Sequence, residues 1–159
     1  MTASSARQVM VGGCLCGQLR YEAFDPIDAG YCHCRLCQRS SGGPVLAWAT
    51  LSTECFSYTG GRPESFASSS SGRREFCANC GTQIAFRDER TPDRVDVNIA
   101  SLDDPARVEP KYHIWVSSQI SWFDTRDDLP RYAEDGPDSQ PPEQPTDPSR
   151  DPSRQQPHE

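Results

Sequence analysis

Short stretches in which apolar and polar residues alternate recur along this chain and predict β-strands. Within residues 18–23 every second side chain is apolar, which is the pattern of a strand with one buried face. The apolar run VLAWATL at residues 45–51 predicts a strand that is buried on both faces. Further strands are predicted over residues 55–59, 83–86 and 95–100, and an aromatic and β-branched segment at 113–123 predicts one that opens at His113.

Clusters of glycine, proline, serine and aspartate separate these stretches and mark turns. The clearest clusters lie at residues 25–26, 40–44, 60–61 and 68–72, and residues 102–105 predict a turn or the start of a helix. No long stretch follows the helical period, and no internal repeat is present. The pattern therefore predicts a mostly β fold of small, packed antiparallel sheets with few or no helices.

The two ends of the chain lack this pattern. Residues 1–8 predict a flexible leader. Residues 133–159 hold seven of the fourteen prolines and neither an aromatic nor a branched aliphatic side chain. Such a segment cannot bury enough apolar surface to offset the entropy lost on ordering. We therefore expect one folded domain over residues 9–132, followed by a disordered, acidic, proline-rich tail.

Negative charge is concentrated in the expected tail. The tail carries seven acidic and two basic side chains, which gives −5 of the formal net charge of −7. The body is thus close to neutral, and this argues against nucleic acid as a partner, because nucleic acid favours a basic face. No apolar run approaches the length of a membrane span, and the N-terminus has no apolar signal region. We expect a cytoplasmic protein that binds neither nucleic acid nor membranes.

Eight cysteines carry the most specific chemistry in the sequence. In a cytosolic setting thiols stay reduced. The CxC and CxxC spacings also suit a shared metal ion better than strained local disulfides. We therefore expect the cysteines to form metal sites.

Three of the cysteines gather in the segment YCHCRLCQR, residues 31–39. Cys32 and Cys34 are two positions apart, so on an extended backbone their side chains leave on the same face. A tight turn would bring Cys37 back to them. Three thiolates suit an ion such as zinc and leave a tetrahedral ion one ligand short. Catalytic zinc sites keep an open position, whereas structural ones are closed by four protein ligands, so this loop indicates an enzyme.

Two further cysteine pairs can close a four-sulfur site. Cys14 and Cys16 form one pair, and Cys77 and Cys80 belong to a CxxCG knuckle, in which glycine permits the tight turn. Together they would form a closed structural zinc site that joins two distant segments. The spacing leaves open a second partition, in which Cys77 and Cys80 complete the central loop instead. In the two-site partition Cys55 is left over and is expected to be a small buried apolar residue.

Several blocks of sequence, in this order, carry a family resemblance. They are GGCLCGQLRYEA (12–23), CHCRLCQRSSGG (32–43), REFCANCGTQIAF (74–86), NIASLDDP (98–105) and HIWVSSQISWFDTRDDLPRY (113–132). With these blocks the chain resembles the family of glutathione-dependent formaldehyde-activating enzymes, which also includes centromere protein V. The resemblance covers residues 11–132 and implies a β-tent-like zinc-binding fold.

The resemblance also implies an activity, a cofactor and a set of ligands. The implied activity is that of a carbon–sulfur lyase, which reversibly condenses glutathione with formaldehyde, so a small-molecule thiol and an aldehyde are the expected partners. Two zinc ions per chain are implied. The matching residues are Cys14, Cys16, Cys77 and Cys80 for the structural zinc, and Cys32, Cys34 and Cys37 for the catalytic zinc. This chain differs from the family pattern at Leu15, where histidine is frequent, and at Gln38, where arginine is common.

At an open three-cysteine site we expect a substrate thiol to bind as a thiolate, because a coordinated thiol is deprotonated by the ion. The thiolate would then attack an aldehyde carbon. Arg35 and Arg39 are candidates for binding the carboxylates of a glutathione-like ligand, although neutralisation of thiolate charge is an equally good interpretation. His113 is a candidate substrate contact, with a structural role as the alternative, and His33 should point away from its neighbouring cysteines.

The rival hypothesis is a non-enzymatic zinc module that acts as a scaffold or interaction domain. In that case the central loop should find a fourth protein ligand, such as His33 or another cysteine. An enzyme should instead show an open coordination position beside a pocket.

Overall fold

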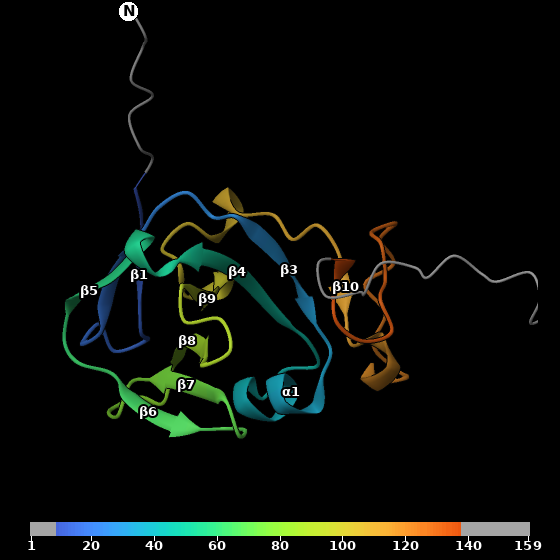
Figure 1. Ribbon diagram of the computed structural model, residues 1–159, viewed down its shortest axis with the longest axis horizontal. Helices are drawn as coiled ribbons and strands as arrows, with labels where there is room; N and C mark the ends of the chain where they lie inside the picture. Colours follow the sequence, from blue (N-terminus) through green and yellow to red (C-terminus); the bar gives the residue numbers. More distant parts are fainter. Residues whose placement is uncertain (1–8, 138–159) are drawn as a thin grey trace, which may run out of the picture.

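The strands form two sheets in the computed structural model, which describes residues 9–137 (Figure 1). The smaller sheet has three antiparallel strands in the order β1-β2-β5, namely β1 (Met10–Gly13), β2 (Arg20–Ala23) and β5 (Phe56–Gly60). The larger sheet has seven strands in the order β10-β3-β4-β9-β8-β7-β6. The prediction of a mostly β fold is confirmed.

The larger sheet is antiparallel except at one edge, where β10 runs parallel to β3. Its strands, in chain order, are β3 (Asp28–Cys32), β4 (Leu46–Ser52), β6 (Glu64–Ala67), β7 (Gly72–Phe76), β8 (Gln83–Asp88), β9 (Arg94–Asn98) and β10 (His113–Ile114). The parallel pairing aligns His113 with Tyr31 and Ile114 with Cys32. A segment near the C-terminus therefore lies beside the strand that leads into the central cysteine loop.

The described residues contain one α-helix, α1 (Arg35–Ser41), which immediately follows that loop. The remaining helical turns are short 3₁₀ helices: η1 (Thr53–Cys55), η2 (Ile99–Ser101), η3 (Pro105–Arg107) and η4 (Val116–Ser118). Helix α1 ends at Gly42, whose φ of 71° is left-handed and whose N–H donates to the Gln38 carbonyl at 2.9 Å. Glycine adopts this backbone conformation without the penalty that a Cβ brings.

Most of the predicted strands are present. The stretches 18–23, 45–51, 55–59, 83–86 and 95–100 correspond to β2, β4, β5, β8 and β9. The strand predicted over 113–123 is wrong beyond Ile114. Trp115 has a φ of 58°, which is incompatible with an extended strand, and η4 follows it directly.

The main core lies between the two sheets and is built from the inward-facing positions of their strands. Its most buried side chains include Leu19, Tyr21, Leu51 and Ile84. Burial raises the pKa of Tyr21 to about 12, although a hydrogen bond with the Ser101 hydroxyl acts in the opposite direction.

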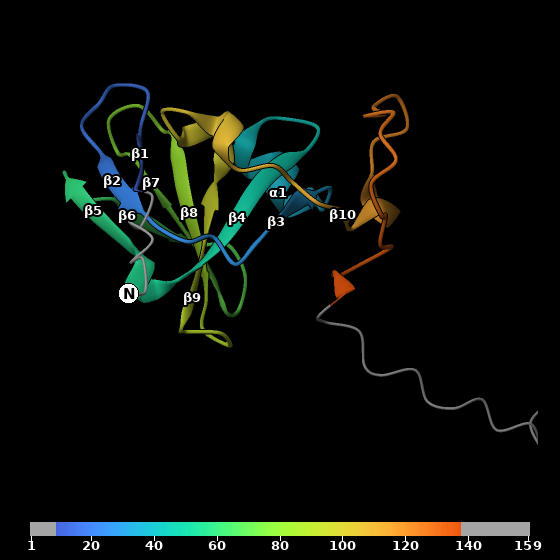
Figure 2. The same ribbon diagram turned by 90° about the horizontal axis from the view of Figure 1, so that it is seen from above.

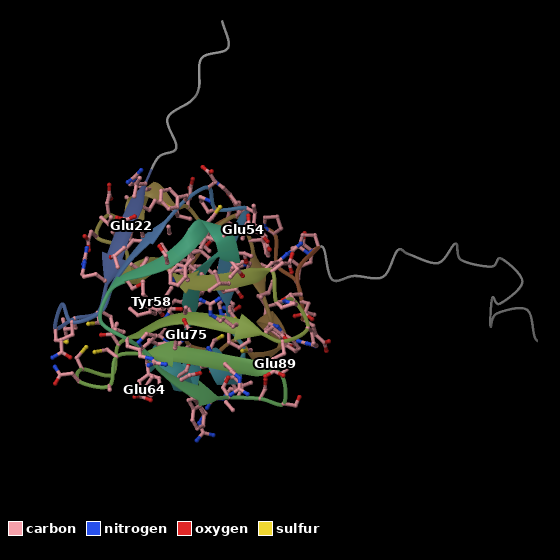
Figure 3. All side chains as sticks on the ribbon, turned by 60° about the vertical axis from the view of Figure 1, so that its left-hand side comes forward. Glu22, Glu54, Tyr58, Glu64, Glu75 and Glu89 are labelled. Atoms are coloured by element: carbon pink, nitrogen blue, oxygen red, sulfur yellow. The ribbon has the colours of Figure 1, made fainter. Side chains whose placement is uncertain are left out.

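A polar bridge joins the two sheets at one side of this core (Figure 3). Tyr58 on β5 donates its hydroxyl hydrogen to Glu75 on β7 at 2.8 Å, and Arg87 Nε on β8 donates to the same carboxylate at 2.7 Å. Burial together with the neighbouring Glu75 charge raises the pKa of Tyr58. The hydroxyl therefore stays protonated and remains a donor.

The last part of the described chain forms an extension at the β10 edge (Figure 2). The N–H of Trp115 donates to the Glu134 carbonyl at 2.8 Å, and the N–H of Ser117 donates to the Ala133 carbonyl at 3.1 Å. The first residues of the expected tail are therefore hydrogen-bonded to the body. The expected leader, and the tail from residue 138 onward, lie outside the described residues. None of the helices in residues 9–137 is both long and apolar enough to span a membrane.

Candidate metal centres and active site

The eight cysteines form two separate clusters and one remainder. The four sulfurs of Cys14, Cys16, Cys77 and Cys80 lie within 4.8 Å of one another, and so do the three sulfurs of Cys32, Cys34 and Cys37. This geometry matches the two-site partition and not the one in which Cys77 and Cys80 complete the central loop. Cys55 belongs to neither cluster, and its half-buried side chain packs against the main core.

Two knuckle turns present the sulfurs of the four-cysteine cluster. Gly17 and Gly81 have φ values of 80° and 75°, and each donates its N–H to the carbonyl of the first cysteine of its pair. The N–H of Leu19 donates to Cys14 Sγ at 3.1 Å. Hydrogen bonds from Thr82, first from its hydroxyl, lower the pKa of Cys80 to about 5. These bonds favour the thiolate, the form of cysteine that binds a metal, at Cys80.

The three-cysteine cluster forms where β3 ends and α1 begins. Cys32 is the last residue of β3, and Cys34 is the N-cap of α1, with its Sγ accepting the Cys37 N–H at 3.3 Å. The predicted tight turn is therefore the first turn of a helix. Gln38 holds the loop in place, because its side-chain amide donates to the carbonyls of His33 at 2.7 Å and Ser118 at 3.1 Å.

Hydrogen bonds among the three sulfurs shift their pKa values in different directions. Bonds from the Cys32 and Cys37 thiols lower the pKa of Cys34 to about 2. The bond to Cys34, the bond to Cys37 and burial all raise the pKa of Cys32. Three thiolates this close together would repel one another, and a cation bound between them would relieve that repulsion.

The two candidate ligands named for closing the central site do not join it. No cysteine, histidine, aspartate or glutamate within residues 9–137 supplies a fourth ligand atom to the group. His33 is fully buried and points away from the sulfurs, as expected for its position between two ligands, with its Nε2 at 2.8 Å from His113 Nδ1. Burial, and then the nearby His113, lower the pKa of His33 to about 4, so the ring is neutral at physiological pH.

A chain of three side chains, made of two buried histidines and a partly exposed aspartate, lies next to the cysteine loop. His113 is fully buried, and its Nε2 lies at 3.1 Å from both carboxylate oxygens of Asp127. Both ring nitrogens of His113 thus have a partner, so direct contact with a substrate would require one of these bonds to break. The main-chain N–H of His33 also donates to the Ile114 carbonyl at 3.0 Å.

The two arginines predicted to bind substrate lie in different surroundings on α1. Arg35 is exposed, and its guanidinium donates to the Gln38 side chain. Arg39, also exposed, lines a cavity of about 420 Å³ together with Leu36, Phe66 and Phe76. A second cavity of about 610 Å³ reaches Cys14 and shares Ser40, Gly81 and Gln83 with the first, so the two are neighbours along α1.

Sequence reasoning missed one charged residue at the site, Arg74 on β7. It lines the 420 Å³ cavity, is only 7 % exposed, and places Nη2 at 3.7 Å from Cys37 Sγ. The only local indication was that Arg74 lies two positions before Phe76 and therefore faces the same side of β7. That signal is weak, because charged residues rarely occupy inward-facing positions.

The chain is similar to one protein family and to known proteins. The family model described as glutathione-dependent formaldehyde-activating enzyme matches residues 9–118. A Halomonas elongata protein, provisionally named glutathione-dependent formaldehyde-activating enzyme, is 25% identical over 126 residues, covering 73% of this chain and 80% of its own length. A crystal structure of a Rhodobacter sphaeroides protein superposes with a TM-score of 0.53 at 24% identity, over 64% of this chain and 92% of that one.

The match to the family model includes all seven clustered cysteines, and the blocks of sequence that carried the resemblance up to residue 118 lie within it. The Rhodobacter sphaeroides structure supports the fold alone. On the match over residues 9–118, this chain belongs to the family of glutathione-dependent formaldehyde-activating enzymes.

Proposed function

We propose that this protein is a zinc-dependent carbon–sulfur lyase that adds glutathione or a similar thiol to formaldehyde or another small aldehyde. The observation that carries the proposal is the cluster of Cys32, Cys34 and Cys37. Its sulfurs converge without a fourth ligand from residues 9–137. Arg74, which lies 3.7 Å from Cys37 Sγ, lines a cavity of about 420 Å³. A structural zinc module would close the shell with protein ligands.

The donor sets fit zinc at both clusters. The four sulfurs of the first cluster could supply all four ligands of a zinc ion, and the three sulfurs of the second would leave one position free. When bound at the second cluster, zinc would lower the pKa of a coordinating thiol so that it ionises at neutral pH. We therefore expect two zinc ions per chain, with distinct roles.

The residues around the three-cysteine cluster would bind and orient the thiol. The 420 Å³ cavity is of the size that holds a small organic ligand, and is far larger than formaldehyde requires. Leu36 and Phe76 supply apolar walls of the cavity, and Arg39 is available to a carboxylate of the thiol. The neighbouring cavity gives a peptide-like thiol room to extend along α1.

The reaction is an addition in which all atoms are conserved. The sulfur of the thiol forms a bond to the aldehyde carbon, the carbonyl π bond breaks, and the proton released by the thiol ends on the new hydroxyl. The product is a hydroxymethyl thioether, and the reverse reaction cleaves the carbon–sulfur bond.

The test is an exchange measurement, because the adduct also forms without a catalyst. Zinc-loaded protein is added to glutathione and ¹³C-formaldehyde at equilibrium, and NMR exchange spectroscopy measures the interconversion of free aldehyde and adduct. We expect the wild type and Cys55→Ser to accelerate exchange, and Cys34→Ser to leave the uncatalysed rate. If Cys34→Ser accelerated exchange as much as the wild type, the three-cysteine cluster would not be the catalytic site. If the wild type did not accelerate exchange with any thiol, the scaffold hypothesis would be favoured.

A further inference from the structure

A buried arginine from a distant part of the chain lies next to the three-cysteine cluster. Arg74 lies on β7, whereas Cys37 lies on α1, and both elements lie in the lower half of the view in Figure 1. Arg74 Nη2 is 3.7 Å from Cys37 Sγ, and the side chain is only 7 % exposed. Its guanidinium carbon sits 5.0 Å from the centre of the Phe86 ring, which fixes its position from the other side.

Arg74 has no carboxylate partner in the described part of the chain. Its neighbours on the same sheet do: Arg73 pairs with Glu89 at 3.2 Å, and Arg87 pairs with Glu75 at 2.7 Å. The Nε of Arg74 is buried and has no hydrogen-bond partner among residues 9–137. A guanidinium remains charged in proteins, and burying it without a counter-charge is strongly unfavourable. The Cys37 sulfur lies within its reach at 3.7 Å, and it would be a negatively charged thiolate when a metal ion is bound.

The net charge of the metal-bound site explains why a positively charged side chain is needed beside it. A divalent ion with three thiolates carries one net negative charge, and an incoming fourth thiolate would raise this to two. In a site shielded from water, that second negative charge is strongly disfavoured unless a positive charge lies close by. Arg74 lines the cavity through which a ligand would approach.

We propose that Arg74 is the positioning residue that balances the charge of the three cysteine thiolates, and so allows an anionic ligand to enter the open position. It acts through Cys37 and not as a ligand of the metal. This inference rests on the proposed function only in taking the open position as the place where a substrate thiol enters.

The test measures ligand binding to cobalt-substituted protein by visible absorption, without any aldehyde. Three probes separate the possibilities: azide is an anion, 2-mercaptoethanol binds as a thiolate without a carboxylate, and imidazole is neutral. We expect Arg74→Gln to weaken azide and 2-mercaptoethanol alike, by at least about tenfold, because a buried charge partner is lost. Imidazole binding should be unchanged, and Arg74→Lys should recover most of the anion affinity.

The matched control is Arg73→Gln, on the same strand but exposed and paired with Glu89. It should bind all three probes as the wild type does. Circular dichroism and the metal content of the four-cysteine cluster establish that each variant is folded. An equal loss of imidazole binding in Arg74→Gln would show a merely structural role and overturn the proposal, as would unchanged anion binding.

Two further outcomes separate this inference from neighbouring ideas. A loss in Arg74→Gln that appears only with 3-mercaptopropionate, and not with 2-mercaptoethanol, would mean that Arg74 binds a substrate carboxylate and would overturn charge balancing. If the wild type binds anions in an Arg74-dependent way but does not accelerate adduct exchange, the proposed function fails while this inference stands. If the wild type accelerates adduct exchange but its affinity for anions does not depend on Arg74, the proposed function stands and this inference fails.

Discussion

The sulfur of Cys34 serves two purposes at once. It caps α1 by accepting the Cys37 N–H at 3.3 Å, and it belongs to the three-cysteine cluster. Serine is a favoured N-cap residue but a poor zinc ligand. We therefore expect Cys34→Ser to remain folded, to hold about one zinc per chain instead of two, and to lose activity.

Circular dichroism and metal analysis check this prediction, with Cys55→Ser as the matched control, because Cys55 lies outside both clusters. The control should retain both ions. A Cys34→Ser protein that still held two ions would show that Cys34 is not a ligand.

Asp96 is a second residue whose environment has a measurable consequence. It accepts a 2.5 Å hydrogen bond from the Thr50 hydroxyl on β4, yet burial raises its pKa from 3.8 to about 6. Between these two pH values the folded chain keeps a proton that the unfolded chain has lost, so this group's contribution to the free energy of unfolding falls as the pH rises. We expect Asp96→Asn to be more stable than the wild type above pH about 6.

Urea unfolding at a series of pH values gives the difference between Asp96→Asn and the wild type. Effects that the two proteins share, including metal release in acid, cancel in this difference. The advantage of the variant should shrink towards pH about 4, where the carboxyl is protonated in both states. A difference that did not change with pH would contradict the raised pKa.

Among the elements, α1 is short and depends on its C-terminal glycine. Gly42 has a φ of 71°, and a Cβ added there would meet no atom within 4 Å, so only backbone strain opposes a larger residue. We expect Gly42→Ala to lower the free energy of unfolding by about 1 kcal/mol. It should also speed metal loss from the three-cysteine cluster, because α1 carries Cys37.

The adjacent Gly43 offers a matched control. An added Cβ there would make ordinary contacts, the nearest at 3.4 Å from the Val45 carbonyl oxygen, and its φ is not left-handed. Gly43→Ala should therefore melt like the wild type. Chemical denaturation and the rate of zinc transfer to a chelator measure both variants, and equal behaviour of the two would argue against the cap.

The four-cysteine cluster joins elements that are far apart in sequence. Cys14 precedes β2, and Cys77 follows β7. A structural zinc contributes on the order of 10 kcal/mol, comparable to the whole stability of a domain. We expect Cys77→Ser to be insoluble or unfolded by circular dichroism. A folded Cys77→Ser beside an unfolded Cys34→Ser would reverse the assignment of structural and catalytic clusters.

The elements also show how far the sequence could be interpreted. Strands with clear alternation, such as β2 and β9, and the two cysteine groups were predictable from local spacing. Strand β6 was not, because all four of its side chains are exposed and it carries no apolar periodicity. Helix α1 is two turns long, which is too short for a periodic signal. Arg74 depends on a contact between distant elements, which no local pattern encodes.

At the scale of the whole molecule, the boundary between body and tail becomes testable. The carbonyls of Ala133 and Glu134 accept hydrogen bonds from Ser117 and Trp115. We expect a chain that ends at Pro137 to melt like the full-length protein, because residues 138–159 lack the composition for a core. A chain that ends at Tyr132 loses both acceptors and should be less stable by about 1–2 kcal/mol. Differential scanning calorimetry compares the three chains, and identical melting of the two truncated forms would contradict the role of these bonds.

The parallel pairing of β10 with β3 has a consequence for biosynthesis. All four sulfurs of the four-cysteine cluster are present once Cys80 has been added, whereas the central loop is supported by Ile114, Ser118 and the His113–Asp127 pair. At roughly 5–20 residues per second, the ribosome needs about 2–9 s to add the chain between Cys80 and Asp127. During that interval a nascent chain can load its first ion while the second site still lacks its support. We therefore expect the four-cysteine cluster to bind a metal ion before the three-cysteine cluster does.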